Sequence, residues 1–484
     1  MSQSRYPMNV TFLQELMTTV AEQGRSLLPK SLLGDTPEVE TIETLAQALI
    51  SSRGEAAGVA LARRVLDQYR RFDAGQKREF FNFLGERMQP DQSKVTKAAE
   101  AYLQAPDPLL LANLQNAVES PRQEFFRRLN LAPGATAGIV AMRRDLLGMG
   151  RGDPMLKLVD NDLKHLLYSW FNRGFLVLRR IDWQTPAAIL EKIIQYEAVH
   201  QIQGWNDLRR RLDPRDRRCF AFFHPALIDE PLIFVEVALT NEISDAIAPL
   251  LAEASRDDEA IEAPTTAVFY SISNCQEGLK GITFGNFLIK QVVEDLVREL
   301  PSLKTFVTLS PVPTFARWLT SDEGKAATKA ILSDDEITAL SLTGRRRWHT
   351  KERAAAAVEP ALMALAAEYY LAAKSRDGKP VDPVARFHLG NGALLERINF
   401  LGDVSEKGID QAVGLMVNYR YNLKEIEKNH EAFVNQGTVA ASRPVRGLLR
   451  SRDKTAAAKE PQAREMLALT VDKKPPNEKG KKGA

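Results

Sequence analysis

The chain has 484 residues, more than a single hydrophobic core usually serves, so we expect two domains and a tail. Hydrophobic residues make up 44% of the chain and charged residues 26%, the balance of a globular protein. No apolar run approaches the roughly 20 residues that span a bilayer, which predicts no membrane partner. Residues 451–484 hold nine Lys or Arg against five Asp or Glu, so the tail supplies the net charge of +3. The body is near neutral, which argues against a nucleic-acid partner.

The N-terminal residues have neither the apolar core of a secretory signal nor the Arg-rich composition of a transit peptide. The two cysteines, Cys219 and Cys275, are too few for a disulfide framework or a zinc cluster. These features predict a cytoplasmic protein in a reducing compartment.

The first part of the chain, from about residue 9 to 196, has the pattern of consecutive helices. Apolar residues recur at spacings of three and four in residues 39–50 and 163–171. Glycine and proline clusters at 106–108, 133–134 and 148–154 mark helix ends. We therefore predict an all-α helical bundle, with His165 in its core because it lies in an apolar stripe.

The pattern changes after about residue 206, where β-branched and aromatic residues form short runs. A turn bracketed by Pro225 and Pro231 is expected between the first two runs. A helix between the last two would make those strands a parallel pair. The predicted strands are Cys219–His224, Leu232–Thr240, Thr266–Ser273 and Thr305–Leu309, and the predicted helix is Asn286–Leu300.

The remainder returns to helix and then to strand. Residues 323–374 are Ala-rich and predict helices. Residues 387–404 and 413–421 have the character of strands, and Asn391-Gly392 is a hairpin signal. Beyond about residue 445 the chain is rich in Lys, Ala, Pro and Gly, which predicts a loosely ordered tail.

Residues 276–286, here named the glycine loop, lie between a predicted strand and a predicted helix. Glycines at 278, 281 and 285 permit close backbone approach to a ligand, and the helix start offers unpaired N–H groups to a phosphate. The loop has neither the ending of a Walker motif nor a GxGxxG pattern. A turn that needs glycine only for backbone reasons remains an equal alternative.

Ser310 follows a predicted parallel strand, at the edge where α/β sites usually form. A turn hydroxyl that bonds its own backbone is the commoner role for such a serine. Among the six histidines, His224, His349 and His388 are all possible partners for it. The sequence pattern alone therefore leaves Ser310 with an undetermined histidine, and no ligand spacing suggests a metal.

Six segments together resemble the malonyl-CoA decarboxylase family, and they extend over about residues 217–423. Several exceed ten residues, so the resemblance is specific. The segments are RRCFAFFHP, EPLIFVEVALT, YSISNCQEGLKGITFGNFLIK, LSPVPTFARWL, FHLGNGALLERINFLGDVSEKGI and GLMVNYRYNL.

The resemblance implies an all-α helical oligomerisation domain over 1–190, a GNAT-like mixed α/β catalytic domain over 191–445, and a basic tail over 446–484. It implies conversion of malonyl-CoA to acetyl-CoA and CO2 in a homotetramer, within fatty-acid or malonate metabolism, without metal, biotin or another cofactor. Its catalytic residues match Ser310, as proton acceptor, and His388, as donor, with a near-neutral pKa expected for His388. Its substrate-binding residues match Lys280, Gly281, Ile282, Thr283, Phe284, Gly285, Asn286, Ser310 and Tyr421.

One position departs from the family pattern. Animal members have a glutamate where this chain has Thr283, so a role for that carboxylate is not expected here. Two other functions stay open. An acyl-CoA-dependent N-acyltransferase on the same fold would use the same loop with an amine acceptor, and a non-catalytic scaffold would bind acyl-CoA without turnover.

Overall fold

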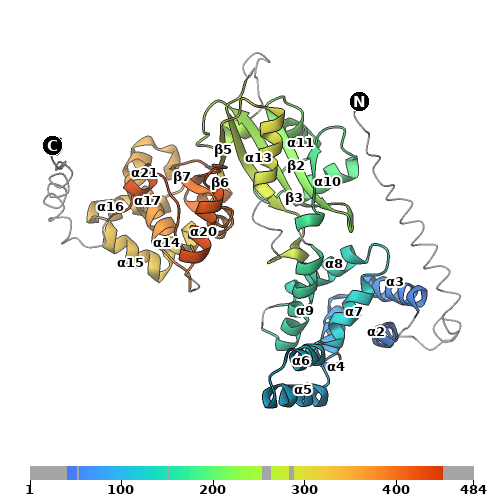
Figure 1. The fold of residues 1–484 in the computed structure, drawn as a ribbon. Coiled ribbons are helices and arrows are strands. Elements are labelled where there is room, and N and C mark those ends of the chain that lie inside the picture. The colour runs from blue at the N-terminus through green and yellow to red at the C-terminus, as the bar shows by residue number, and fades with distance from the viewer. Residues whose placement is uncertain are drawn as a thin grey trace, which may run out of the picture. The chain divides into compact units, whose positions relative to one another are not determined.

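The computed structural model describes residues 41–51, 54–150, 152–171, 173–252, 263–282, 288–376 and 378–450. The chain divides into two compact units (Figure 1). The first unit comprises Met1–Gln203, Phe220–Phe234 and Ser273–Gly285. The second comprises Gly204–Cys219, Val235–Ile272 and Asn286–Ala484.

Helix boundaries of the first unit lie at the three predicted clusters 106–108, 133–134 and 148–154. Asp73 caps α4 through the amide of Gln76, and α6 and α9 each begin with an Asp-Pro pair whose aspartate caps the helix. Aromatic rings, Phe80 and Phe125 among them, fill the core between these helices. The helices are α2 Ile42–Ser51, α3 Glu55–Arg71, α4 Ala74–Arg87, α5 Gln92–Gln104, α6 Pro108–Val118, α7 Pro121–Leu129, α8 Ala135–Gly148, α9 Pro154–Trp170 and α10 Ala187–Tyr196.

Two details of the helical half differ from expectation. His165 is exposed on α9, because the apolar stripe is formed by Leu163, Leu166 and Leu167 on another face of the helix. A short strand, β1 Val177–Ile181, interrupts the helices and joins the sheet beside β2. The prediction of a helical region followed by a mixed α/β sheet is otherwise confirmed.

Among the described residues the sheet has eight strands, and their order is β1-β2-β3-β4-β5-β8-β6, with β7 also paired to β8. β2 and β3 are joined by only Pro225 and Ala226, so the turn is shorter than predicted and β3 continues through Pro231. The strands are β2 Arg217–His224, β3 Leu227–Thr240, β4 Thr266–Asn274, β5 Thr305–Thr308, β6 Ser310–Pro311, β7 Leu394–Asn399 and β8 Met416–Arg420.

The strand–helix–strand segment has the predicted form. β4 and β5 pair in parallel, with Thr266 opposite Thr305. α13 (Leu288–Glu299) connects them, and its buried stripe is the predicted Ile289, Val292, Val293 and Leu296. A core cluster that includes Val268, Val307 and Met416 joins β4, β5 and β8. The carboxyl end of β5 is therefore a fixed point in a buried sheet.

β5 and β6 face β8 in one register, with a gap between them. Val307 lies opposite Arg420, and three residues later Ser310 lies opposite Val417. Within the gap side chains bond the backbone: the amide of Asn418 donates to the carbonyl of Thr308 at 2.8 Å, and the backbone N–H of Tyr419 donates to Thr308 Oγ1 at 3.1 Å. The strand is opened there without a slip in register.

Helices follow β6, and one prediction here is wrong. Residues 387–390 belong to α18 (Pro383–Gly390), because Asp382 and Pro383 start a helix that lasts until Asn391-Gly392. Those two residues connect a helix to β7 and do not form a hairpin. The other helices of the second unit are α11 Trp205–Leu212, α12 Ala248–Leu251, α14 Phe315–Thr320, α15 Asp322–Ile331, α16 Asp334–Leu340, α17 Glu352–Leu371, α19 Glu406–Ala412, α20 Ile426–Gln436 and α21 Arg443–Gly447.

The start of the expected tail is folded. α21 continues to residue 447, and Arg450 forms an ion pair of 2.8 Å with Glu336. Residues 451–484 lie outside the described part of the chain.

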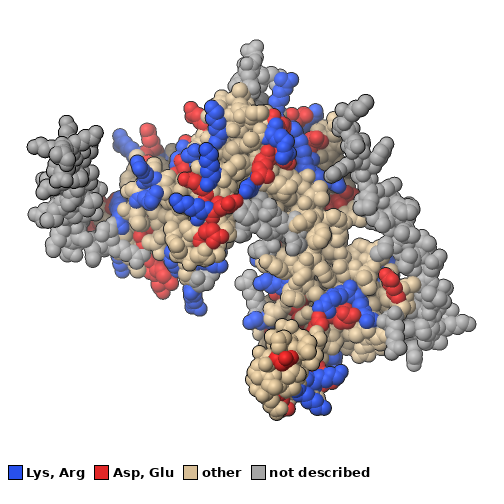
Figure 2. Space-filling view, viewed as in Figure 1, with Lys and Arg blue, Asp and Glu red and all other residues tan. Residues whose placement is uncertain are grey.

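Acidic and basic side chains are interspersed on the face shown in Figure 2. Among the described helices, none combines the length and apolar character that a membrane crossing needs.

Candidate active site

Ser310 stands at the start of β6, just after the gap in the strand. It is 5% exposed, and its backbone is fixed by pairing with β8. Pro311 and Pro313 follow and restrict the chain before α14. The serine is thus presented on a rigid strand end, as the sequence predicts.

His388 reaches Ser310 from the last turn of α18. Its Nε2 lies 3.2 Å from Ser310 Oγ, although the two residues are 78 positions apart in the chain. Its Nδ1 lies 2.8 Å from the phenol oxygen of Tyr421, which directly follows β8. Tyr419 stacks on the imidazole with ring centroids 4.5 Å apart. Three of the predicted site residues, Ser310, His388 and Tyr421, therefore meet in the second unit.

The hydrogen bonds assign a direction to this group, here named the hydroxyl–imidazole chain (Thr308, Ser310, His388 and Tyr421). Ser310 donates its only proton to Thr308 Oγ1 at 2.8 Å, so Ser310 Oγ accepts from His388 Nε2–H. The imidazole then has a bare Nδ1, which accepts from the Tyr421 hydroxyl. In this arrangement His388 is a donor towards Ser310 and not its base.

Burial determines the protonation states of the side chains in the hydroxyl–imidazole chain. Loss of solvation lowers the pKa of His388 to about 3, so the ring is neutral near pH 7. This differs from the near-neutral pKa expected from the sequence. Burial also raises the pKa of Tyr421 well above its usual value, so the phenol keeps its proton. The site is a neutral, desolvated set of donors and acceptors.

The glycine loop lies in the first unit, and only its residues up to Ile282 are described. Gly278 is required by packing, because a Cβ there would lie 2.0 Å from the carbonyl oxygen of Val140 on α8. Gly281 is required by its backbone φ of +79°, with no comparable crowding. Thr283, Phe284, Gly285 and Asn286 lie outside the described residues.

Arg143 of α8 holds the loop by its backbone. Its guanidinium donates to the carbonyl of Gly278 at 2.6 Å and to that of Lys280 at 3.0 Å. Asp160 of α9 holds the other side of the guanidinium at 2.8 Å. Arg143 is buried, so the loop is fixed by a charge-assisted contact from the helical region.

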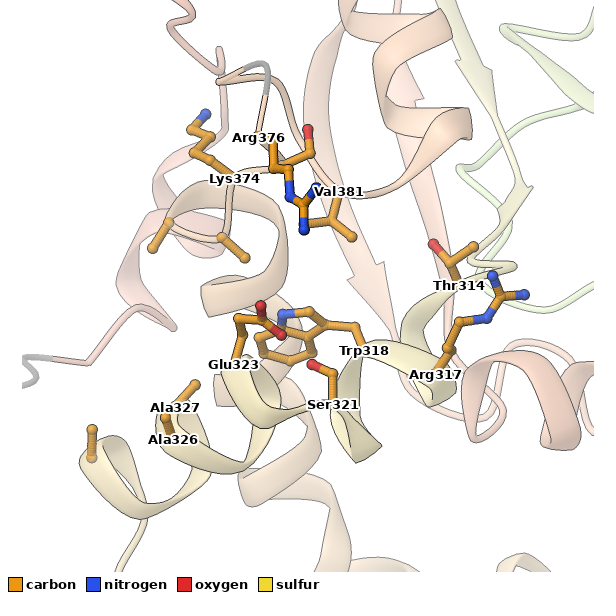
Figure 3. Close-up of a pocket in the computed structure, with 14 residues that line it drawn as sticks. Thr314, Arg317, Trp318, Ser321, Glu323, Ala326, Ala327, Lys374, Arg376 and Val381 are labelled. Atoms are coloured by element: carbon orange, nitrogen blue, oxygen red, sulfur yellow. The ribbon is translucent and has the colours of Figure 1, made fainter. Parts of the chain in front are cut away.

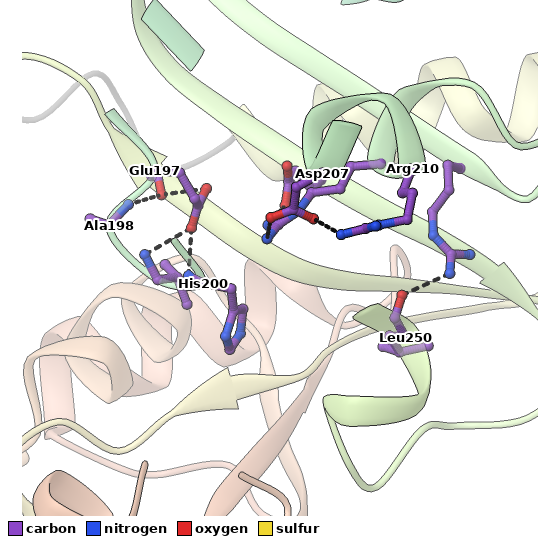
Figure 4. Close-up of polar contacts among 11 residues, drawn as sticks. Glu197, Ala198, His200, Asp207, Arg210 and Leu250 are labelled. Atoms are coloured by element: carbon purple, nitrogen blue, oxygen red, sulfur yellow. Dashed lines mark hydrogen bonds and ion pairs between the residues drawn. The ribbon is translucent and has the colours of Figure 1, made fainter. Parts of the chain in front are cut away.

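The strand that leads into the loop is anchored by Glu197. Its carboxylate accepts from the backbone N–H groups of Val199 and His200, both at 2.8 Å, and from the Ser273 hydroxyl at 3.2 Å (Figure 4). Ser273 lies near the end of β4, three residues before the loop. The end of β4 is therefore tied to a side chain distant in sequence.

Sequence reasoning missed Thr308, Tyr419 and Arg143. Thr308 lies two residues before Ser310 on a strand, so its position on the same face was a usable signal. Nothing in the local sequence of α8 points to Arg143, because the loop carbonyls that it binds are more than a hundred residues away. In the part of the chain that the structure describes, no group of three His, Cys, Asp or Glu could hold a metal.

A mixed α/β sheet with a buried serine–histidine–tyrosine chain at a strand end defines an enzyme of the acid–base class. Two protein-family models match the chain. The one described as the malonyl-CoA decarboxylase C-terminal domain matches residues 174–459, and the one described as the N-terminal domain matches residues 88–171. The chain belongs to the malonyl-CoA decarboxylase family, which confirms the resemblance seen in the sequence.

Individual relatives agree with this assignment. The mitochondrial malonyl-CoA decarboxylase of Anser anser anser is 34% identical over 458 residues, which cover 88% of this chain and 89% of that protein. The crystal structure of malonyl-CoA decarboxylase from Rhodopseudomonas palustris has 52% identity and a TM-score of 0.79, and covers 84% of this chain and 98% of its own. The crystal structure of malonyl-CoA decarboxylase from Agrobacterium vitis has 55% identity and a TM-score of 0.80, and the match covers 85% of this chain and 100% of that one.

Proposed function

We propose that this family member converts malonyl-CoA to acetyl-CoA and CO2 at the hydroxyl–imidazole chain, without metal or biotin. The observation that carries the residue assignment is the 3.2 Å contact between Ser310 Oγ and His388 Nε2 in a buried site. Ser310 is the proposed acceptor of hydrogen bonds and His388 the proposed donor.

Burial favours the carbon–carbon bond cleavage. A malonyl carboxylate is strongly solvated in water and loses that stabilisation in a neutral, desolvated site. In the transition state the charge spreads over Cα and the thioester oxygen, which donors such as His388 Nε2–H can stabilise. The site therefore destabilises the charged carboxylate of the bound substrate more than it destabilises the transition state, and this difference lowers the barrier.

The proton for Cα comes from the same chain. The electron pair of the broken bond takes a proton from His388 Nε2, while Nδ1 receives the proton of Tyr421. After CO2 and acetyl-CoA leave, a solvent proton enters at Nε2 and Nδ1 returns its proton to Tyr421, which restores the starting tautomer. Each turnover therefore consumes one proton and releases one CO2. A covalent acyl-serine is disfavoured, because the Ser310 hydroxyl donates to Thr308 and the imidazole donates to Ser310.

The glycine loop is the proposed site of the CoA pyrophosphate. Lys280 supplies a charge, and the family match extends over the residues that follow it in the sequence, Gly281 to Asn286. The remaining proposals rest on the family resemblance: a homotetramer formed through the helical region, in the cytoplasm, within fatty-acid or malonate metabolism. Light scattering on the full chain tests the tetramer.

The decisive experiment is incubation of the full-length protein with malonyl-CoA alone, in D2O, with chelator and avidin present. We expect CO2 and acetyl-CoA that carries one deuterium in its methyl group, at the same rate with and without the chelator and avidin. Turnover that requires an added amine would instead establish an N-acyltransferase. Loss of activity with chelator or avidin would overturn the cofactor-free mechanism, and acyl-CoA binding without turnover would leave only a scaffold.

A further inference from the structure

A cavity lies in the second unit, separate from the hydroxyl–imidazole chain, and the proposed function gives it no role. Its volume is about 830 Å³, within the range of pockets that hold nucleotide-sized ligands. None of Ser310, His388 and Tyr421 lines it. α14, α15 and the segment after α17 enclose it (Figure 3).

Part of the cavity lining is apolar. Alanines of α15 and of the segment after α17 contribute methyl groups. The indole of Trp318, which is only 6% exposed, packs on Tyr369 with centroids 5.1 Å apart. Its Nε1 is buried and has no hydrogen-bond partner among the described residues. A buried donor of this kind is costly unless an acceptor reaches it.

The rim is basic, with one acidic exception. Among the described residues, Arg317, Lys374 and Arg376 line the cavity, and Glu323 is the one carboxylate that does. The backbone N–H of Glu323, the Ser321 hydroxyl and the charge of Arg376 together lower the pKa of the Glu323 carboxyl. Figure 3 shows Arg376 extending toward Trp318 and Glu323. Guanidinium groups in such a setting suit a phosphate.

These groups together match one ligand chemistry. Adenine presents an amino donor beside a ring-nitrogen acceptor on one edge, whereas guanine presents two acceptors there. Glu323 can accept from the amino group, and Trp318 Nε1–H can donate to the ring nitrogen. The arginines remain for a phosphate on the ribose. We propose that this cavity binds an adenine nucleotide through Trp318, Glu323, Arg317 and Arg376.

The cavity wall is connected to the helix that carries His388. Thr314 Oγ1 lies 2.6 Å from the hydroxyl of Tyr369, and that hydroxyl donates to Asp382 at 3.1 Å. Asp382 caps α18 through the backbone N–H groups of Val384 and Ala385. Trp318 therefore contacts, through the ring of Tyr369, the residues that hold the start of the helix carrying His388. The nucleotide is either the adenosine phosphate of the CoA substrate or a free adenine nucleotide.

Calorimetric titration of the full-length protein with AMP, GMP and adenosine tests the site without turnover. We expect AMP to bind in the micromolar to millimolar range, and GMP and adenosine about tenfold more weakly, since one lacks the amino donor and the other the phosphate. Absence of AMP binding, or equal binding of all three, would overturn the proposal.

Variants locate the site. Arg376→Ala should weaken AMP binding about tenfold. Glu323→Gln and Trp318→Phe should reduce the preference for AMP over GMP, and the latter keeps the packed ring. The control is Arg346→Ala, which removes an exposed arginine outside the cavity and should change nothing. AMP binding that is the same in Arg376→Ala as in wild type excludes the cavity as the site.

Competition identifies the source of the nucleotide. Displacement of AMP by CoA, with a raised KM of Arg376→Ala for malonyl-CoA but not for malonyl-pantetheine, assigns the cavity to the substrate. AMP binding in the presence of saturating CoA assigns it to a free nucleotide. The assignment of the cavity to the CoA substrate rests on the proposed function, but the AMP titration does not. A protein that binds AMP and lacks decarboxylase activity would therefore refute the assignment to the substrate and leave the nucleotide site intact.

Discussion

The glycine loop and the hydroxyl–imidazole chain are positioned by different means. The loop is held from outside, by the Arg143 guanidinium on its carbonyls and by Gly278 pressed against α8. The hydroxyl–imidazole chain is held from within, because each of its side chains is a hydrogen-bond partner of the next. Substitutions near the loop should therefore affect stability and binding, whereas substitutions in the chain should affect turnover.

The largest expected effect is that of His388→Ala. Loss of the donor should lower kcat by about 10²–10⁴-fold, with little change in the affinity for CoA, because the loop is untouched. Steady-state kinetics with malonyl-CoA and calorimetry with CoA check both halves of this statement. A kcat close to that of wild type would remove His388 from the mechanism.

The two described glycines of the loop should respond differently to alanine. Gly278→Ala places a methyl group against the Val140 carbonyl and should reduce the free energy of unfolding by about 3 kcal/mol or more. Gly281→Ala meets no such contact and should cost about 1–2 kcal/mol through its positive φ. Urea unfolding measures both. Equal losses would contradict the distinction between packing and backbone conformation.

Gly281→Val tests whether a side chain on the loop blocks substrate binding, separately from its effect on stability. The larger side chain should raise the KM for malonyl-CoA by obstructing the loop surface, with kcat less affected. An unchanged KM would argue against the loop as the phosphate site.

Tyr421→Phe removes the proton donor behind the imidazole and keeps the ring. We expect kcat to fall about 10–100-fold, with a smaller change in KM. Tyr419→Phe is the matched control, because Tyr419 contacts His388 through its ring and its hydroxyl is not part of the hydroxyl–imidazole chain. Equal losses in both variants would indicate a packing effect and not a proton path.

Arg143→Lys should loosen the loop while keeping a buried cation beside Asp160. A lysine cannot hold two carbonyls and a carboxylate as the guanidinium does, so KM should rise about tenfold while kcat changes little. Arg144→Lys, at an exposed neighbouring position, is the control. A fall in kcat with constant KM would place Arg143 in the chemistry instead.

A further expected effect concerns the dependence of stability on pH. The pKa of His388 is about 3 in the folded protein and about 6.5 when unfolded, so between these values only the unfolded state takes up its proton. Stability must therefore fall on acidification through this window, by up to about 1.4 kcal/mol per pH unit from this residue. His388→Gln should show the shallower decline in urea midpoints. Parallel curves would contradict the burial of a neutral ring.

The sequence predicted what is local in this fold and missed what depends on tertiary contacts. The stripe of α13 and the Asp-Pro starts of α6 and α9 follow from periodicity and capping, which act within a few residues. The assignment of residues 387–390 to a strand is wrong because Asp382 and Pro383 start a helix that ends at Asn391-Gly392. His165 was misplaced because stripe periodicity does not resolve neighbouring helix faces.

The site shows the same division. Ser310 at a strand end could be suspected from the sequence order of strand, helix and strand. Its pairing with His388 came from family resemblance alone, since a separation of 78 residues carries no local signal. The neutral state of the imidazole and the hydrogen bonds from Arg143 to the loop could not be predicted, because burial and long-range contacts exist only in the folded chain.

The constant register across the gap between β5 and β6 limits how this segment can change in length. Side chains successively alternate between the two faces of a strand, so one inserted or deleted residue between Val307 and Ser310 would turn the serine to the opposite face. Substitutions at Leu309 can be absorbed by repacking, but a change in the count of residues cannot. The distance along the strand from Val307 to Ser310 is therefore as much a part of the catalytic apparatus as the serine itself.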